Sequence, residues 1–142
     1  MSDPRPSFAV DANVLLRYVL RDEEELAQRA RHIWQAVERA QIVAVLDPVI
    51  LSEVVLVMSR TYGLSNEEIA EALTSMVELD HVVMVAKPRY VRALRLFGHS
   101  VKHFGDACAC ACALEECEGH LYSFDRKLSA VPGVQRREEW TG

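Results

Sequence analysis

The sequence predicts a single α/β domain with a central, mostly parallel sheet of four to five short strands flanked by helices. The chain has 142 residues, which is the length of one domain. Short apolar runs of the strand type alternate with longer segments of helical periodicity. Strands that are separated by helices pair in parallel. Because the sequence has no repeat, linker or low-complexity segment, we expect one domain over residues 1–142.

The expected elements alternate along the chain. The strand-like runs are short and apolar, and they cover residues 7–10, 42–46, 82–85 and 121–124, with a possible edge strand after the turn at 131–134. The helix-like segments lie between these runs, at residues 13–20, 22–37, 48–62, 65–79, 88–97 and 106–118. Asp22 and Ser65 are expected to cap helices at their starts, and Gly98 and Gly119 are expected to end helices.

Composition argues against several classes of function. Half of the residues are hydrophobic, 26% are charged and the net charge is −5, so no global basic field attracts nucleic acid. Met1–Pro6 has no apolar stretch of the signal-peptide type. The most apolar segment, residues 42–58, is interrupted by Asp47 and Glu53 and is short for a membrane span. We therefore expect a cytoplasmic protein that does not associate with membranes.

The cysteines Cys108, Cys110, Cys112 and Cys117 fall within one expected helix. Helical geometry directs Cys110 away from the face of Cys108 and Cys112, so one zinc ion could not gather all the thiolates. We interpret them as small core residues in a reducing compartment, with a zinc or redox role as the alternative.

Two acids follow apolar strands at opposite ends of the chain, Asp11 after the first strand and Asp125 after the strand at 121–124. Ligands of an open α/β sheet bind beyond the carboxyl ends of its strands, so we expect both carboxylates at one edge of the sheet. The alternative for each is a helix cap. Asn13 and Ser123, each two residues from one of these acids, could support a metal-bound carboxylate or act as simple cap or turn residues.

Glu53 and Asp106 complete a set of candidate acids. Glu53 lies in a helix that is apolar on nearly every side, so we predict that it is buried and either binds a cation or pairs with an arginine such as Arg60. Asp106 opens a helix of small residues, where it can act as a cap or approach the sheet edge. His103 lies three residues before it, and we interpret that side chain as solvated.

Four carboxylates in one pocket would raise one another's pKa unless a cation neutralised them. Mg²⁺ and Mn²⁺ prefer carboxylate and water oxygen as ligands. The sequence therefore predicts a divalent metal site without His or Cys ligands, formed by Asp11, Glu53, Asp106 and Asp125.

Four segments of the sequence resemble the motifs of the PIN domain. Val10–Arg17 resembles its opening motif, and the later motifs are matched by Ser52–Val54, Phe104–Ala107 and Ser123–Leu128. Each motif alone is weak, but all occur in the family's order and spacing, from Phe8 to about Arg136. The compact length is most similar to the VapC-type toxins of bacterial and archaeal toxin–antitoxin pairs.

This resemblance implies a PIN-like fold and a ribonuclease that uses Mg²⁺ or Mn²⁺, with RNA as substrate, a small antitoxin as partner and usually a homodimer. By position it assigns metal binding and catalysis to the four acids and supporting roles to Asn13 and Ser123. The chain differs from the family in having Ser123 where Thr is common, and cysteines where Ala, Leu or Ile are common. Metal-dependent hydrolysis is expected to leave a 5′-phosphate and a 3′-hydroxyl.

Four cations near the motifs are candidates for phosphate contacts, with a solvated surface role as the alternative: Arg17, Lys102, Arg126 and Lys127. Other functions stay open. A phosphatase or phospho-signalling domain would use an acceptor Asp, but Asp11-Ala12-Asn13 lacks the second Asp of the phosphatase pattern. A PIN nuclease of RNA processing, or a PIN module that binds RNA without cleaving it, would carry the same motifs and have no antitoxin.

Overall fold

The computed structural model describes residues 3–142 and confirms an α/β fold with parallel strands. Met1 and Ser2 lie outside the described residues. They belong to the Met1–Pro6 segment, which is not expected to be a signal peptide. The elements are, in chain order, β1 (Ser7–Ala9), α1 (Ala12–Leu20), α2 (Glu24–Glu38), β2 (Val43–Val45), α3 (Pro48–Arg60), α4 (Asn66–Val77), β3 (Val82–Val83), α5 (Lys87–His99), α6 (Phe104–Glu116), β4 (His120–Tyr122), the 3₁₀ helix η1 (Arg126–Ala130) and β5 (Gln135–Arg137).

The strands form two sheets in place of the expected single one. The first sheet has the order β1-β2-β3, with Ser7 opposite Val43 and Ala44 opposite Val82. The second sheet consists of β4 and β5, with His120 opposite Gln135. Every strand pair in residues 3–142 is parallel, as predicted. The expected continuous sheet is divided because β4 does not pair with β1.

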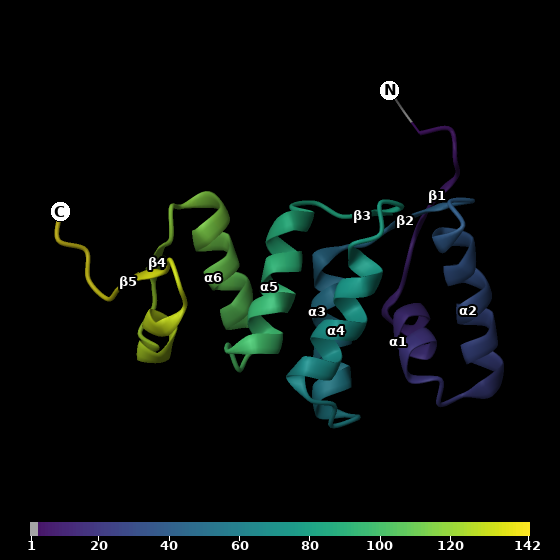
Figure 1. Ribbon diagram of the computed structural model, residues 1–142, viewed down its shortest axis with the longest axis horizontal. Coiled ribbons are helices and arrows are strands. Elements are labelled where there is room, and N and C mark those ends of the chain that lie inside the picture. Colours follow the sequence, from purple (N-terminus) through teal and green to yellow (C-terminus); the bar gives the residue numbers. More distant parts are fainter. Residues whose placement is uncertain (1–2) are drawn as a thin grey trace.

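Figure 1 shows the elements in a row along the long axis of the molecule. The sheet β1-β2-β3 lies toward one end with α1 and α2, and the helices α3 and α4 lie near the middle. The helices α5 and α6 follow, and the sheet β4-β5 lies at the far end. Contacts between α4 and α5 and between α5 and α6 hold this row together. The two sheets are therefore separated by packed helices.

The α4–α5–α6 row is a well-packed part of the core. Leu94 and Ala107 are fully buried in it, and the rings of Phe97 and Phe104 meet edge to face with centroids 5.7 Å apart. Gly98 lies inside α5 and does not end it, contrary to the sequence prediction. A Cβ at Gly98 would lie 2.6 Å from the Cβ of Ala70, so glycine is required here for the close approach of α4 and α5.

Local capping explains where several helices begin. The side chain of Asp47 accepts a hydrogen bond from the N–H of Val49 (2.8 Å) and starts α3. The predicted capping box of α4 is confirmed by reciprocal hydrogen bonds between Ser65 and Glu68. The predicted cap at Asp22 is wrong, because Glu23 occupies that position and Asp22 accepts hydrogen bonds from Arg17 (2.7 Å) and Tyr62 (2.6 Å) instead.

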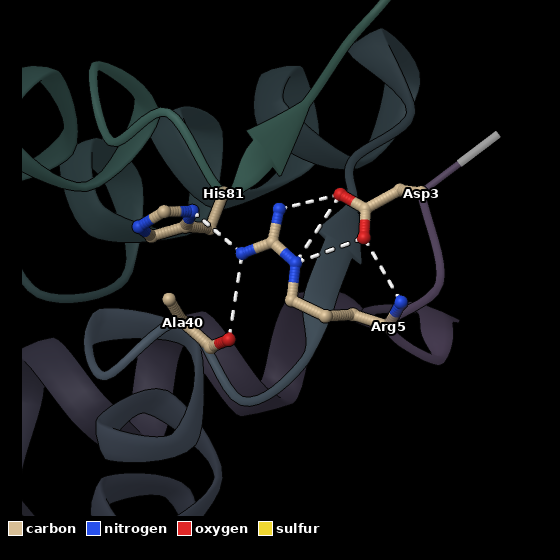
Figure 2. Close-up of polar contacts among 4 residues, drawn as sticks. All are labelled: Asp3, Arg5, Ala40 and His81. Atoms are coloured by element: carbon tan, nitrogen blue, oxygen red, sulfur yellow. Dashed lines mark hydrogen bonds and ion pairs between the residues drawn. The ribbon is translucent and has the colours of Figure 1, made fainter. Parts of the chain in front are cut away.

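Arg5 connects the segment before β1 to the segments that precede β2 and β3 (Figure 2). Its guanidinium donates to the carbonyl of Ala40 (3.4 Å), in the turn before β2, and to Nδ1 of His81 (2.9 Å), just before β3. It also donates to the Asp3 carboxylate, and this side-chain hydrogen bond is the main cause that lowers the pKa of Asp3 to about 2. These contacts help to fix the position of β1 beside β2.

Helices do not cover the sheet β1-β2-β3 completely. Val45 and Val83 lie opposite each other on neighbouring strands and are 40% and 50% exposed. The expected flanking by helices is therefore incomplete on this face. Within residues 3–142, no helix has both the length and the apolar character needed to cross a membrane.

Candidate functional site

Asp106 and Asp125 line one pocket of about 180 Å³. Asp106 lies in the first turn of α6, and Asp125 lies in the loop between β4 and η1. Lys102, His103 and Lys127 line the same pocket. The structure thus brings together two of the predicted acids with two ammonium groups and an imidazole. Carboxylates suit a hard cation, and the ammonium groups suit an anion such as phosphate.

The electrostatics of the neighbouring Cys110 agree with this arrangement. Burial is the main cause that raises the pKa of the Cys110 thiol, and the charges of Asp106 and Asp125 raise it further. Both carboxylates are therefore close enough to act on one thiol. In addition, the amino-terminal end of α6 favours a negative charge at Asp106.

Ser123 supports the loop that carries Asp125. Its hydroxyl accepts a hydrogen bond from the backbone N–H of Asp125 (3.0 Å). Asp125 in turn accepts from the N–H of Lys127 (3.0 Å) and caps η1. Asp125 therefore acts as a helix cap, the alternative that the sequence left open, and it does so through its Oδ1 atom. The hydrogen bond from the Lys127 N–H also holds the carboxylate in the pocket.

Asp11 lies in a different pocket, a shallow groove of about 540 Å³ at the carboxyl ends of β1 and β2. It occupies the N-cap position of α1, but its side chain makes no capping hydrogen bond. Asp47, which follows β2 as Asp11 follows β1, lines the same groove. Asp11 is thus exposed, and its carboxylate does not cap α1.

Glu53 is exposed, and the prediction that it is buried is wrong. The helix α3 buries one face, made of Leu51, Val54, Val55 and Met58, whereas Val49 and Leu56 on other faces are exposed. The apolar residues around Glu53 therefore do not surround its carboxylate. No ion pair involving Glu53 occurs among the salt bridges of residues 3–142, so the alternative of a pair with Arg60 is also wrong.

The exposure of Glu53 gives a stability prediction. We expect Glu53→Gln to change the free energy of unfolding by less than about 0.5 kcal/mol in EDTA, because an exposed carboxylate without a partner contributes little. Thermal and urea unfolding of both proteins measure this difference. A loss of about 3 kcal/mol or more would instead indicate a stranded buried charge and would contradict the position of Glu53 in the structure.

The structure does not gather all four predicted acids. In the part of the chain that it describes, no group of three or more His, Cys, Asp or Glu side chains is arranged to hold a metal ion. Asp106 and Asp125 are together, Asp11 is in the groove beside β1, and Glu53 is on the surface of α3. The donor chemistry fits Mg²⁺ or Mn²⁺ at the Asp106–Asp125 pair, which offers part of a ligand set.

The other predicted residues fall into two groups. Lys102 and Lys127 line the Asp106–Asp125 pocket, and Arg126 is exposed at the start of η1. Arg17 is held in the fold instead, because it donates to Asp22 (2.7 Å) and to the hydroxyl of Tyr62 (3.2 Å). Asn13 is exposed on α1 and lines the groove between α1 and α2, away from Asp11's groove.

The cysteine helix matches most of its prediction. All four thiols are free, Cys110 is buried, and Cys108 and Cys112 are half-buried, which agrees with small packing residues. Burial raises the pKa of Cys108 to about 11, so this thiol is protonated near neutral pH. Cys117 is exposed at the end of α6, which corrects its assignment to the core.

Sequence reasoning missed two residues that line the acidic pockets. Asp47 had the same signal as Asp11, an acid directly after a buried strand, but it was interpreted only as a break in an apolar segment. His103 lies at helical spacing from Asp106, and its predicted solvated position is confirmed because the residue is exposed, but it also lines the Asp106–Asp125 pocket. Both side chains could have been found by applying one rule to every strand end and helix start.

Comparison with known proteins gives one positive result. The model of the PIN domain family matches residues 8–134, which is most of the chain. No curated protein and no solved structure matches the chain. The matched range begins in β1 and ends just before β5, so it contains the four predicted acids Asp11, Glu53, Asp106 and Asp125. The chain therefore belongs to the PIN domain family.

Proposed function

We propose that this protein is a ribonuclease that depends on Mg²⁺ or Mn²⁺. PIN domains are generally nucleases that use divalent metals, so membership of the family supports a nuclease function. The single observation that carries the proposal is the pairing of Asp106 and Asp125 in one pocket with Lys102 and Lys127. Carboxylates that bind a hard cation, next to cations that bind phosphate, are what phosphodiester hydrolysis requires.

Each part of the pocket has a role in this proposal. Asp106 and Asp125 would hold the divalent ion, and the ion would supply water activation and charge neutralisation at the scissile phosphate. Asp11 and Glu53 match the acidic positions of the family motifs and would complete the ligand set if they were brought to this pair. Lys102 and Lys127 bind and orient the phosphodiester backbone. Ser123 keeps Asp125 in place through its hydrogen bond to the Asp125 N–H.

A nuclease assay tests the proposal. Purified protein is incubated with generic single-stranded RNA in Mn²⁺, in Mg²⁺ and in EDTA, and the ends of the products are analysed. We expect cleavage only with metal, and products that carry a 5′-phosphate and a 3′-hydroxyl. RNA that binds the protein but stays intact in every metal would favour the alternative, an RNA-binding PIN module without catalysis.

The role of the cations near Asp125 gives a binding prediction. Replacing both Arg126 and Lys127 by Ala should weaken RNA binding equally for different sequences, because phosphate contacts carry no sequence information. For single-stranded RNA, the slope of log K against log salt should fall by about 1.4, which is two contacts at roughly 0.7 each. Fluorescence anisotropy at several salt concentrations measures the slope. An unchanged slope would assign both residues to the solvated surface.

We extend the proposal to a toxin that is silenced by an antitoxin in the cytoplasm. A groove of about 610 Å³ lies between α1 and α2 and is lined in part by Val14, Leu26 and Ile33. Leu26 and Ile33 are 42% and 38% exposed, so an apolar segment of an antitoxin could cover them in helix-in-groove fashion. Expression of the toxin alone should arrest growth, and co-expression of the antitoxin should restore it. Unimpaired growth with soluble, nuclease-active protein would contradict the toxin role.

A further inference from the structure

Both sheets have an open edge. In the first sheet, the N–H of Val10 donates to Val45 (3.2 Å) and the carbonyl of Pro6 accepts from Val43 (2.9 Å), so these residues face β2. Backbone groups of a strand alternate in direction, so the N–H and carbonyl groups of Ser7 and Ala9 face away from β2. β1 is therefore an edge strand whose outer side is free to pair with a further strand.

The same reasoning applies to β4. The carbonyl of Gly119 accepts from Gln135 (2.7 Å) and the N–H of Ser123 donates to Arg137 (3.1 Å), so Gly119 and Ser123 face β5. The backbone groups of His120 and Tyr122 therefore face away from β5, although the His120 N–H already donates to Cys117 (3.0 Å). The β4 edge thus offers the carbonyl of His120 and both backbone groups of Tyr122.

Aromatic side chains are exposed on both edges. Phe8 on β1 is 53% exposed, and Tyr122 on β4 and Phe124 just after it are 57% and 84% exposed. Edge strands with exposed aromatic residues favour association with another strand. Parallel pairing of β4 with β1 would bury part of these surfaces and join the two short sheets into one of five strands.

One chain cannot make this pairing in the arrangement that the structure shows. β1 and β4 lie at opposite ends of the molecule, with α5 and α6 between them (Figure 1). To bring β4 to its own β1, α6 would have to leave α5 and break the buried Phe97–Phe104 contact. A second copy, placed antiparallel to the first, could offer its β4 while each copy keeps its own Phe97–Phe104 contact.

We propose that two copies exchange their carboxyl-terminal halves, so that β4 of each copy pairs with β1 of the other. Ala9 then lies opposite Leu121, since this register lets the Ala9 N–H donate to the carbonyl of His120 and the Tyr122 N–H donate to the carbonyl of Ala9. Asp11 of one copy lies opposite Ser123 of the other, with Asp125 two residues further along. Each active site thus combines Asp11 from one copy with the Asp106–Asp125 pair from its partner.

This inference rests on the proposed nuclease function, and it explains why one chain keeps the predicted acids apart. Complementation between inactive variants tests it. Asp11→Asn and Asp125→Asn proteins are unfolded together and refolded, and RNA cleavage in Mn²⁺ is compared with the wild type. We expect each variant alone to be inactive and the mixture to recover about a quarter of the wild-type activity, because about half of the dimers are mixed and each has one intact site of two.

A matched control uses two acids of the same half. A mixture of Asp106→Asn and Asp125→Asn should recover no activity. Both acids lie in the carboxyl-terminal half of the chain, so each carboxyl-terminal half in every dimer lacks one of them. Recovery in this control would show an exchange of smaller segments than we propose. Absence of recovery in the Asp11–Asp125 mixture, with active wild-type protein, would overturn the proposal and place the site within one chain.

Mass measurements test the exchange without activity. Wild-type protein should sediment at twice the monomer mass of 16.0 kDa. Ala9→Pro and Tyr122→Pro each remove an N–H on an open edge and should give monomers, whereas Ala9→Ser keeps the N–H and should stay dimeric. Circular dichroism confirms that each variant is folded. Monomeric wild-type protein would overturn the exchange. If the wild-type protein is a dimer that both proline substitutions dissociate, but it does not cleave RNA, the exchange stands and only the proposed nuclease function is contradicted.

Discussion

Replacing Asp106 by Asn is expected to lower the rate of RNA cleavage more than about 100-fold. A loss of about 100-fold is the largest that is typical when a residue supporting a metal ligand is removed, so a direct ligand should cost more. Asp106 faces the pocket together with Asp125, and Asn keeps the shape of the side chain while it removes the charge that binds a cation. The initial rate of cleavage at saturating Mn²⁺ measures the effect. Metal titration by calorimetry should show a parallel loss of binding.

The fold should tolerate this substitution. The loss of a negative charge at the start of α6 costs about 0.3–1 kcal/mol, and relief of repulsion with Asp125 offsets part of that cost. Asp80→Asn is the matched control, because Asp80 is exposed and does not line this pocket. It should leave both the cleavage rate and the melting temperature unchanged. A rate for Asp106→Asn equal to that of this control would exclude Asp106 from the site.

Most of the elements could be predicted because local signals agree with each other. The capping box at Ser65 and Glu68 and the alternation of apolar runs placed α4 and the strands close to their observed positions. The ends of helices are harder to predict where tertiary packing, and not the local sequence, decides where the helix stops. Gly98 has the residue type of a helix end, but it serves the contact between α5 and Ala70, and sequence reasoning does not show which neighbouring helix will approach.

The exposure of Glu53 could not be predicted from its apolar neighbours in the sequence. An apolar helix is expected to be buried on every side only if there is enough protein to cover it. In this structure, α3 buries one face, and Val49 stays 73% exposed on another. The same sequence pattern therefore fits a fully covered helix and a helix with an open apolar face, and only the arrangement of the other elements distinguishes them.

The candidate site was predicted in parts for a similar reason. The rule that acids gather at the carboxyl ends of parallel strands requires that the strands share a sheet. β4 and β1 are in separate sheets, so the rule places Asp11 and Asp125 correctly with respect to their own strands but not beside each other. Pairing between strands distant in the sequence has no local signal, which is why it stays the least predictable step.

Gly119→Ala is expected to destabilise the β4–β5 part of the protein by roughly 4 kcal/mol, the sum of backbone strain and overpacking at about 1–3 kcal/mol each. Gly119 has a φ of +89°, and a Cβ there would lie 2.0 Å from the carbonyl oxygen of Gly133. Backbone atoms cannot move aside as a flexible side chain would. The hydrogen bond from the Gln135 N–H to Gly119 (2.7 Å) would also be distorted, and β5 would separate from β4.

Gly63→Ala separates the two causes. Gly63 also has a positive φ, +62°, but a Cβ there would have nothing within 4 Å. This variant should therefore lose only the cost of the left-handed backbone, about 1–2 kcal/mol. Urea unfolding gives both free energies, and nuclease activity gives a second readout, because displacement of β4 moves Asp125 and only Gly119→Ala should abolish cleavage. Equal losses of stability in the two variants would show that the Gly119–Gly133 contact does not hold the second sheet together.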